Sequence, residues 1–320
     1  MRKILFVTAT RIGDAVLSTG LLGHLVERHP GARFTIAAGP DAAPLFEAVP
    51  GLDRLVVMEK RRFALHWALL YGTVAVRRWD LVVDLRGSAL AYVLWTRDRK
   101  VAAKGDYAEH RVVQLARLFA LDPPPAPRLW LAPHHLERAA ALVPAGGPVL
   151  AIGPAANWRG KEWRAERFAE LACALTAPDG PLPHARVAVL AAAHERAQAQ
   201  PVLDALPQAR RIDLVGRVDL LTAAAALKRC ALFVGNDTGL MHIAAATGIP
   251  TLGLFGPSLA SHYAPWGKLA AVVSTSIPAE ELFQRGFDHR TTDTLMDSLG
   301  VEAAEAAARS LLERVAGAAA

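Results

Sequence analysis

Short apolar runs alternate with longer helical patterns along the whole chain. The runs are four to eight residues long and rich in Val, Ile, Leu and Ala, which is typical of strands buried on both faces of a parallel sheet. Helices are predicted between them, beginning with residues 14–29. This alternation predicts an α/β fold. The predicted strands are residues 3–9, 34–37, 54–58, 80–85, 149–153, 186–190, 211–214, 231–234 and 250–255.

Two proline-rich segments interrupt this alternation near the middle of the chain. Residues 122–127 hold four prolines, and a short helix predicted at 133–142 follows them. The segment 144–148, Pro-Ala-Gly-Gly-Pro, is the best linker candidate. We therefore predict two Rossmann-like domains, residues 1–147 and 148–320, whose strand-to-helix loops face a central cleft. A last helix is predicted at 301–315.

Composition and charge narrow the class of protein. With 52% hydrophobic and 21% charged residues, the chain is globular, and no apolar run is long enough to span a bilayer. The N-terminus lacks the features of a signal peptide, and the isolated Cys173 and Cys230 fit a reducing cytoplasm. Residues 1–147 hold 20 Lys and Arg against 13 Asp and Glu, whereas residues 148–320 hold 16 against 17. The basic half favours an anionic partner, which is nucleic acid, an anionic membrane or an acidic substrate. The alternative for any single basic cluster is a solvated surface.

The most informative segment is Asn236-Asp237-Thr238-Gly239-Leu240-Met241-His242, followed by Phe255-Gly256-Pro257-Ser258. It begins where a predicted strand passes into the N-terminus of a helix. Free backbone N–H groups and the positive end of the helix dipole favour an anion there, and a phosphate or diphosphate suits the site. The alternative is that Asp237 or Thr238 only caps the helix.

These residues resemble the donor-site signature of glycosyltransferase family 9, the ADP-heptose:lipopolysaccharide heptosyltransferases, which have the GT-B fold. The resemblance runs from about residue 2 to residue 258. It implies that the second domain binds the nucleotide sugar, and that the last helix packs back on the first domain. The donor-binding residues it implies are Asp237, Thr238, Gly239, Leu240 and His242.

Two further segments carry the candidate catalytic residues. Thr10-Arg11-Ile12-Gly13-Asp14 follows the first strand and has no dinucleotide-binding fingerprint. The resemblance implies that Asp14 is the general base and places Arg11 toward the acceptor, although Asp14 is equally suited to cap a helix. Lys161-Glu162-Trp163 resembles the family's Lys-x-Trp-Pro element, with Arg164 in place of proline. Lys161 would neutralise the leaving diphosphate, and we expect Arg164 to alter the local turn.

Three weaker candidates complete the site. Glu195 follows the strand at 186–190, and the resemblance implies that it holds the ribose or base of the nucleotide. The alternative is a plain acidic residue in the first turn of a helix. Arg86, in a segment similar to the family's Asp-x-Gln-Gly, is expected to grip a carboxylate or phosphate of the acceptor. His110 also has a counterpart in the family. For Arg86 and His110, packing or a surface role is an equal alternative.

The resemblance thus implies an inverting glycosyltransferase. Because no metal-ligand spacing is present in the sequence, we expect this enzyme to need no metal ion or other cofactor. The resemblance implies ADP-heptose as donor and an anionic, lipid-linked saccharide as acceptor. It also implies a cytoplasmic enzyme in peripheral contact with the inner membrane, with no nucleic-acid partner. The alternatives are a transferase for another nucleotide sugar, a nucleotide-sugar epimerase or hydrolase, and a non-enzymatic basic module that binds anionic surfaces.

Overall fold

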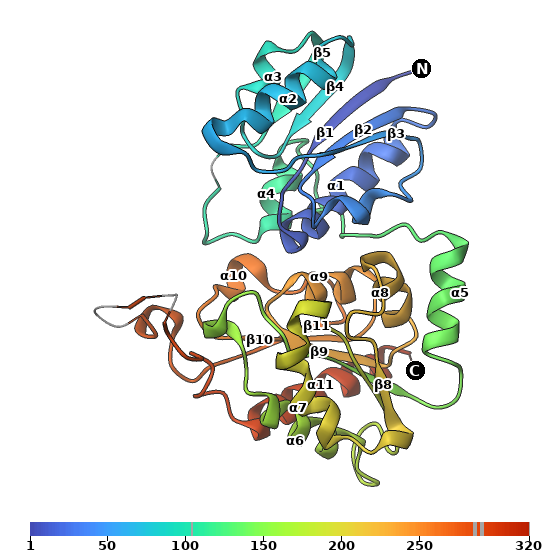
Figure 1. Cartoon of the computed structure of the whole chain (residues 1–320), viewed down its shortest axis with the longest axis vertical. Helices are drawn as coiled ribbons and strands as arrows, with labels where there is room; N and C mark the ends of the chain where they lie inside the picture. Colours follow the sequence, from blue (N-terminus) through green and yellow to red (C-terminus); the bar gives the residue numbers. More distant parts are fainter. Residues whose placement is uncertain (104, 284–286, 289–290, 320) are drawn as a thin grey trace. The chain divides into compact units, whose positions relative to one another are not determined.

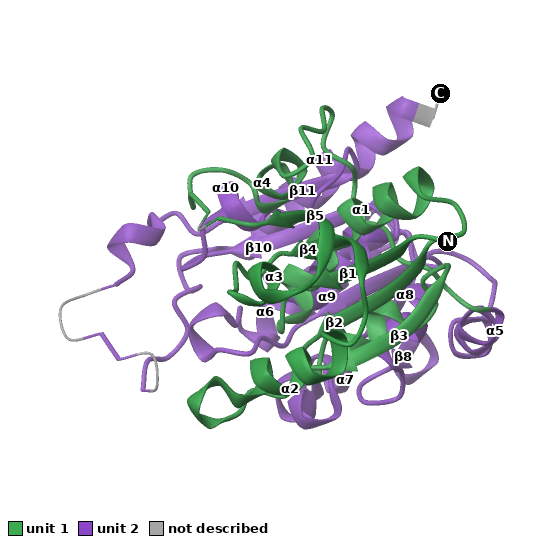
Figure 2. Ribbon diagram, turned by 90° about the horizontal axis from the view of Figure 1, so that it is seen from above, with its two compact units in different colours: residues 1–132 green, residues 133–320 purple. Residues whose placement is uncertain are grey.

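The computed structural model describes residues 1–103, 105–283, 287–288 and 291–319. Two compact units divide between Ala132 and Pro133. The sequence predicted a boundary after residue 147, but helix α5 (Pro133–Leu142) packs against α8 (Leu220–Leu227) and is therefore part of the second unit. Figure 1 labels the elements, and Figure 2 colours the two units.

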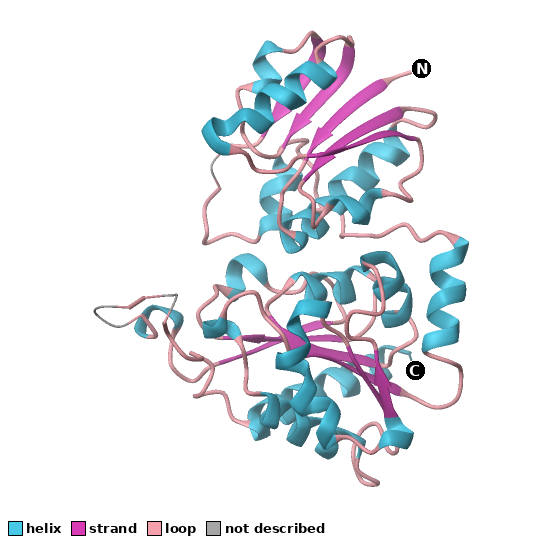
Figure 3. Cartoon of the chain, viewed as in Figure 1, coloured by secondary structure: helices cyan, strands magenta, loops and turns pink. Residues whose placement is uncertain are grey.

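Unit 1 is a parallel sheet with strand order β3-β2-β1-β4-β5. Leu5 and Val7 of β1 face the core below α2 and α3, and the alternate residues Ile4 and Phe6 are equally buried on the other face. Helices α1 and α4 pack together on that second face (Figure 3). The elements are β1 (Lys3–Val7), α1 (Ile12–Arg28), β2 (Arg33–Ala38), β3 (Leu52–Val57), α2 (Leu65–Val74), β4 (Trp79–Asp84), α3 (Leu90–Val93), β5 (Thr96–Val101) and α4 (Arg111–Arg117).

Unit 2 is a parallel sheet with strand order β11-β10-β9-β6-β7-β8. Helices α6, α7 and α11 bury their apolar sides on one face of the sheet, and α8 and α9 lie on the other (Figure 3). Besides α5 and α8, the elements are β6 (Val149–Gly153), α6 (Ala165–Thr176), β7 (Arg186–Val189), α7 (Arg196–Ala205), β8 (Arg211–Asp213), β9 (Leu232–Asn236), α9 (Gly239–Ala246), β10 (Thr251–Phe255), α10 (Ala260–Tyr263), β11 (Ala270–Ser274) and α11 (Val301–Ala319).

The predicted fold class, two parallel-sheet α/β domains, is confirmed. Each predicted strand is present within one or two residues of its predicted bounds. The edge strands β5 and β11 were not predicted. Helix α11 packs on α6, β10 and β11 within its own unit, and its packing on the first domain stays a prediction.

Candidate functional site

The site in unit 2 forms where the order of strands reverses. The chain runs from β6 outward to β7 and β8, then returns to β9 on the other side of β6. Gly153 of β6 pairs with Gly235 of β9, so both strands end at the same level. A Cβ on Gly235 would lie 2.8 Å from the carbonyl oxygen of Gly153, which explains glycine at this close approach. Ligands of open parallel sheets bind at the carboxyl ends of strands at such a reversal.

Lys161 and Asp237 meet at this reversal. Lys161 ends a short 3-10 helix that follows β6, and Asp237 follows β9 directly. The Lys161 Nζ donates to Asp237 Oδ2 over 2.6 Å, and the His242 Nε2 lies 3.9 Å from Asp237 Oδ1. Asp237 and His242 are both buried, whereas the Lys161 side chain keeps 24% of its surface exposed. The structure thus brings three of the predicted site residues together, and the ammonium group of Lys161 remains accessible to a ligand.

Helix α9 begins beside this ion pair. Thr238 is its N-cap by position, with no side-chain cap hydrogen bond, and Gly239 is its first residue. The side chain of Leu240 lies over Gly153. The N-cap is Thr238 and Asp237 pairs with Lys161, so a capping role does not account for Asp237. The free backbone N–H groups at the N-terminus of α9 lie next to this ion pair and are suited to an anion.

Asn236 connects the loops after β6 and β9, a role that the sequence analysis did not predict although Asn236 begins the donor-site segment. Its Oδ1 accepts from the backbone N of Trp163 over 3.1 Å, and its Nδ2 donates to the carbonyl of Pro154 over 2.7 Å. Asn236 is fully buried, so both bonds are sheltered from water. A polar residue at the last position of an apolar strand was the available signal.

A second buried network, also not predicted, centres on Glu162. Its carboxylate accepts from Arg159 over 2.7 Å and from the Gln198 amide over 2.8 Å. Burial raises the pKa of Glu162 despite the Arg159 guanidinium, and the charge of Glu195 raises it further. The Gln198 Oε1 accepts from the backbone N of Ala156, which ties α7 to the loop that carries Lys161.

Arg164 occupies the position where the resembled family has proline. Its backbone has φ −60° and ψ 136°, the region that proline itself adopts, and α6 begins at the next residue. Arg164 therefore keeps a backbone conformation that proline could also adopt, and the expected alteration of the turn is not observed. The guanidinium donates to Asp297 through two bonds of 2.6 Å and to Asp293 over 3.2 Å. Where the family has the proline ring, this chain thus has an arginine that forms ion pairs with Asp293 and Asp297.

Glu195 lies after β7, next to β6 in the sheet. Its Oε2 accepts from the backbone N of Ala192 over 2.8 Å, so one oxygen has the local helix-start role that was the alternative. The carboxylate is half-buried at the same edge of the sheet as Lys161. A role toward the nucleotide stays a prediction.

Unit 1 has its own strand reversal, between β1 and β4. Val7 pairs with Asp84, so the segments after both strands start at one level. Arg11 is the N-cap of α1 by position, and Asp14 lies in the first helical turn, so Asp14 is not the cap. Arg86 follows β4, and its guanidinium lies 5.5 Å from the centroid of the Trp67 ring.

Two neighbouring residues have structural roles in the same region. Asp84 is fully buried and accepts from the backbone N–H groups of Arg86 and Ser88 over 2.8 and 3.0 Å, which fixes the turn after β4. His110 is the N-cap of α4, and its Nδ1 accepts from Val112 N over 3.2 Å. His110 therefore has a capping role, and its contact with an acceptor stays a prediction.

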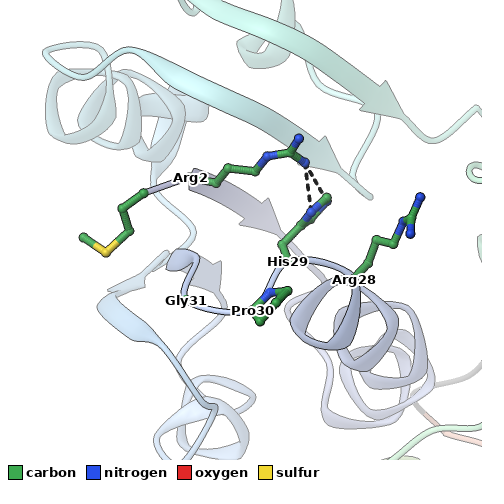
Figure 4. A pocket seen from close by; sticks show the side chains of 6 residues that line it. Arg2, Arg28, His29, Pro30 and Gly31 are labelled. Carbon is green, nitrogen blue, oxygen red and sulfur yellow. Dashed lines mark hydrogen bonds between the residues drawn. The ribbon is translucent and has the colours of Figure 1, made fainter.

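A hollow of about 440 Å³ lies elsewhere on unit 1, lined by Met1, Arg2 and residues 28–31 (Figure 4). The Arg2 Nη1 donates to His29 Nδ1 over 2.9 Å, and burial together with Arg2 and Arg28 lowers the pKa of His29. These residues lie at the start of β1 and the end of α1. That is the opposite edge of the sheet from Asp14 and Arg86, so we do not regard this hollow as the candidate active site.

The described residues contain no group of three or more His, Cys, Asp or Glu side chains suited to hold a metal ion. Among them, no helix is both long and apolar enough to cross a membrane.

The profile of glycosyltransferase family 9 (heptosyltransferase) matches residues 81–288. The chain belongs to this family. The match covers the strand ends that carry Arg86, Lys161 and Asp237, so the predicted family is confirmed and the chain is a glycosyltransferase. Membership excludes a purely non-enzymatic binding module.

Similar proteins agree with this assignment. The lipooligosaccharide heptosyltransferase 2 of Haemophilus influenzae is 23% identical over 310 residues, covering 85% of this chain and 88% of that protein. A family 9 glycosyltransferase from Veillonella parvula superposes with a TM-score of 0.77 at 19% identity, covering 98% and 97% of the two chains. An E. coli heptosyltransferase solved with ADP gives a TM-score of 0.71 at 18% identity, with 97% and 99% covered. The chain therefore has the fold of these enzymes.

Proposed function

We propose that the chain is an inverting heptosyltransferase that moves heptose from ADP-heptose to the inner core of lipopolysaccharide. One observation carries the proposal. Lys161 is held by Asp237 at 2.6 Å, at the strand reversal of unit 2 and beside the N-terminus of α9. An ammonium and a helix N-terminus at one point are suited to a diphosphate.

The donor binds to unit 2 in this proposal. The diphosphate lies against Thr238 and Gly239 at the start of α9, and Lys161 reaches the phosphate oxygens. Asp237 positions Lys161 through their ion pair, and the buried His242 lies beside the other oxygen of Asp237. Leu240 packs beneath the donor, and Glu195 holds the ribose or base. That a similar enzyme was solved with ADP supports adenine as the base.

The acceptor binds to unit 1, with Arg11, Arg86 and His110 as its contacts. An acceptor hydroxyl oxygen attacks the anomeric carbon and forms the new glycosidic bond, while the bond from that carbon to the diphosphate oxygen breaks. The hydroxyl proton passes to the Asp14 carboxylate, and ADP leaves with the electron pair. Attack from the face opposite the leaving group inverts the anomeric centre.

The partner classes follow from this chemistry. The acceptor is an anionic, lipid-linked saccharide, which agrees with the basic charge of the first half of the chain. The enzyme acts in the cytoplasm, in peripheral contact with the inner membrane, and binds no nucleic acid. Lys161 and α9 supply the positive charge, so no metal ion or other cofactor takes part.

Calorimetry with ADP, UDP and GDP in metal-free buffer tests the donor. We expect selective ADP binding that is lost in Asp237→Ala and kept in Asp179→Ala. Asp179 is an exposed aspartate that precedes β7 and so lies at the opposite edge of the same sheet. Preference for UDP or GDP would overturn ADP-heptose as donor. Release of free sugar or an epimer without any acceptor would favour the epimerase or hydrolase alternative.

A further inference from the structure

Helices α2 and α3 present an unusual outer surface. Their inner residues, among them Leu70 and Leu90, pack into one core on the same face of the unit 1 sheet (Figure 1). Eight of the fifteen large apolar residues that are exposed in the described chain lie between residues 63 and 95. We call the most apolar part of this region the α2–α3 surface, which consists of Phe63, Leu65, Leu69, Tyr92, Val93 and Trp95.

The exposure on this surface is large. Phe63 is 98% exposed and Trp95 is 68% exposed. Phe63 also has a backbone φ of 51°, in the left-handed region that a bulky residue rarely adopts. Soluble proteins seldom expose so many large apolar side chains within one short stretch of chain, and large exposed apolar areas mark interaction sites.

The stretch of chain that carries the α2–α3 surface is basic. Residues 59–100 hold nine Lys and Arg against four Asp and Glu, a net charge of +5 out of +6 for the whole chain. The Arg78 guanidinium lies 5.0 Å from the ring centroid of Trp95, and that of Arg99 lies 5.7 Å from the ring of Tyr92. The positive charge therefore lies at the aromatic side chains themselves.

This combination fits one partner chemistry better than others. Aromatic rings with cationic neighbours are typical of the boundary between lipid headgroups and acyl chains, and aliphatic side chains insert beside them. Anionic headgroups complement the basic residues. A nucleic acid would use aromatic stacking but would leave Leu65, Leu69 and Val93 in water.

The α2–α3 surface is also connected to the predicted acceptor residues. Trp67 of α2 packs against the same core, and Arg86 lies over its ring. Arg86 follows β4, which neighbours the strand that leads to Asp14. A bilayer held by this surface would keep a lipid-linked acceptor close to unit 1, a step that rests on the proposed function.

We infer that the α2–α3 surface docks onto an anionic lipid bilayer, with Phe63, Leu65 and Leu69 inserted and the basic residues against the headgroups. The inference thus assigns the membrane contact of the proposed function to one surface of unit 1.

Co-sedimentation with vesicles of phosphatidylethanolamine and phosphatidylglycerol in equal parts tests this inference. The triple change Phe63→Ser, Leu65→Ser and Leu69→Ser should weaken binding about tenfold or more. The pair Arg61→Glu and Arg62→Glu should weaken it by about the same factor and reduce its dependence on salt. The control Leu136→Ser, at an exposed leucine of α5, should bind like the native chain.

Three outcomes would overturn the inference. They are a native chain that does not sediment with these vesicles, a triple variant that sediments as well as the native chain, and a triple variant that changes only from dimer to monomer, which would make a second copy the partner. Circular dichroism and ADP calorimetry on each variant separate this test from the proposed function. A triple variant that binds ADP normally but no longer binds vesicles supports the inference. A native chain that does not bind ADP would contradict only the proposed donor, ADP-heptose.

Discussion

The Nζ of Lys161 lies 2.6 Å from Asp237 Oδ2, although 76 residues separate the two along the chain. The aspartate is nearly fully buried and the lysine is not. A buried carboxylate can therefore orient an ammonium whose outer side remains open to a ligand. Isolated buried pairs add little net stability, so we relate this one to positioning rather than to folding.

Replacing Lys161 with methionine removes the charge and keeps the length of the side chain. We expect kcat to fall on the order of a hundredfold, because one preorganised donor to the leaving group is lost. The measurement is turnover of ADP-heptose with a heptose-free core acceptor. Lys228→Met, at an exposed lysine after α8, is the matched control. Unchanged turnover in Lys161→Met would remove Lys161 from the mechanism.

Asp14→Asn tests the general base. The amide cannot take the acceptor proton, so kcat should fall about 10²–10⁴-fold. Affinity for ADP should stay the same, since the donor residues belong to unit 2. Glu27→Gln changes an acid near the other end of the same helix, where Glu27 pairs with Arg128 at the surface, and should leave both quantities unchanged. An Asp14→Asn enzyme with native turnover would show that another group takes the proton.

Metal independence is tested by chelation. Lys161 and the N-terminus of α9 are proposed to supply the positive charge that a divalent ion supplies elsewhere. Turnover should therefore be the same before and after treatment with EDTA. Loss of turnover that added Mg²⁺ restores would contradict this prediction.

The ion pairs of Arg164 should contribute stability that depends on pH. The hydrogen bonds from Arg164 are the main cause that holds the pKa of Asp297 below its ordinary value of 3.8. A depressed carboxyl pKa stabilises the fold above the unfolded value, and this contribution is lost as the pH falls through the folded value. Both side chains are well exposed, so Arg164→Ala should cost only about 1 kcal/mol near neutral pH.

Thermal unfolding at a series of pH values measures this effect. The difference in Tm between Arg164→Ala and the native chain should be largest above the ordinary carboxyl pKa of 3.8, and it should shrink as the pH falls through the lowered pKa of folded Asp297. Arg138→Ala, at an exposed arginine of α5, serves as the control. A difference that does not change with pH would mean that Arg164 acts through packing and not through its charge.

The sequence predicted best the strands that are buried on both faces along their whole length. Strands β6 and β9 are buried along their whole length, so they consist of apolar residues and glycine except for Asn236, the last residue of β9. The edge strand β5 was missed because it reads Thr-Arg-Asp-Arg-Lys-Val and is largely exposed. Charged residues on an edge strand hinder pairing with other chains, and they also hide the strand from hydrophobic patterning.

In the site, residues within local sequence motifs were predicted, whereas contacts between distant segments were not. Asp237 and His242 were predicted from the specific donor-site motif, and Lys161 from a less specific segment considered together with it. The structure places the three residues close together. The bonds from Asn236 to Trp163 and Pro154 depend on which strands are neighbours, which no local pattern reveals. The same holds for Arg164 and Asp297, which pair across 133 residues.

The loop that carries Lys161 is completed by a segment that is synthesised much later. Leu295 N donates to the carbonyl of Gly160 over 3.0 Å, and the Trp163 indole donates to the carbonyl of Leu299 over 2.9 Å. On the ribosome, unit 1 emerges first and has all of its strands before residue 133 is made. The Lys161 loop can form all of these hydrogen bonds only after residue 299 has left the exit tunnel. In the nascent chain, the proposed acceptor domain can therefore fold well before the proposed donor site is complete.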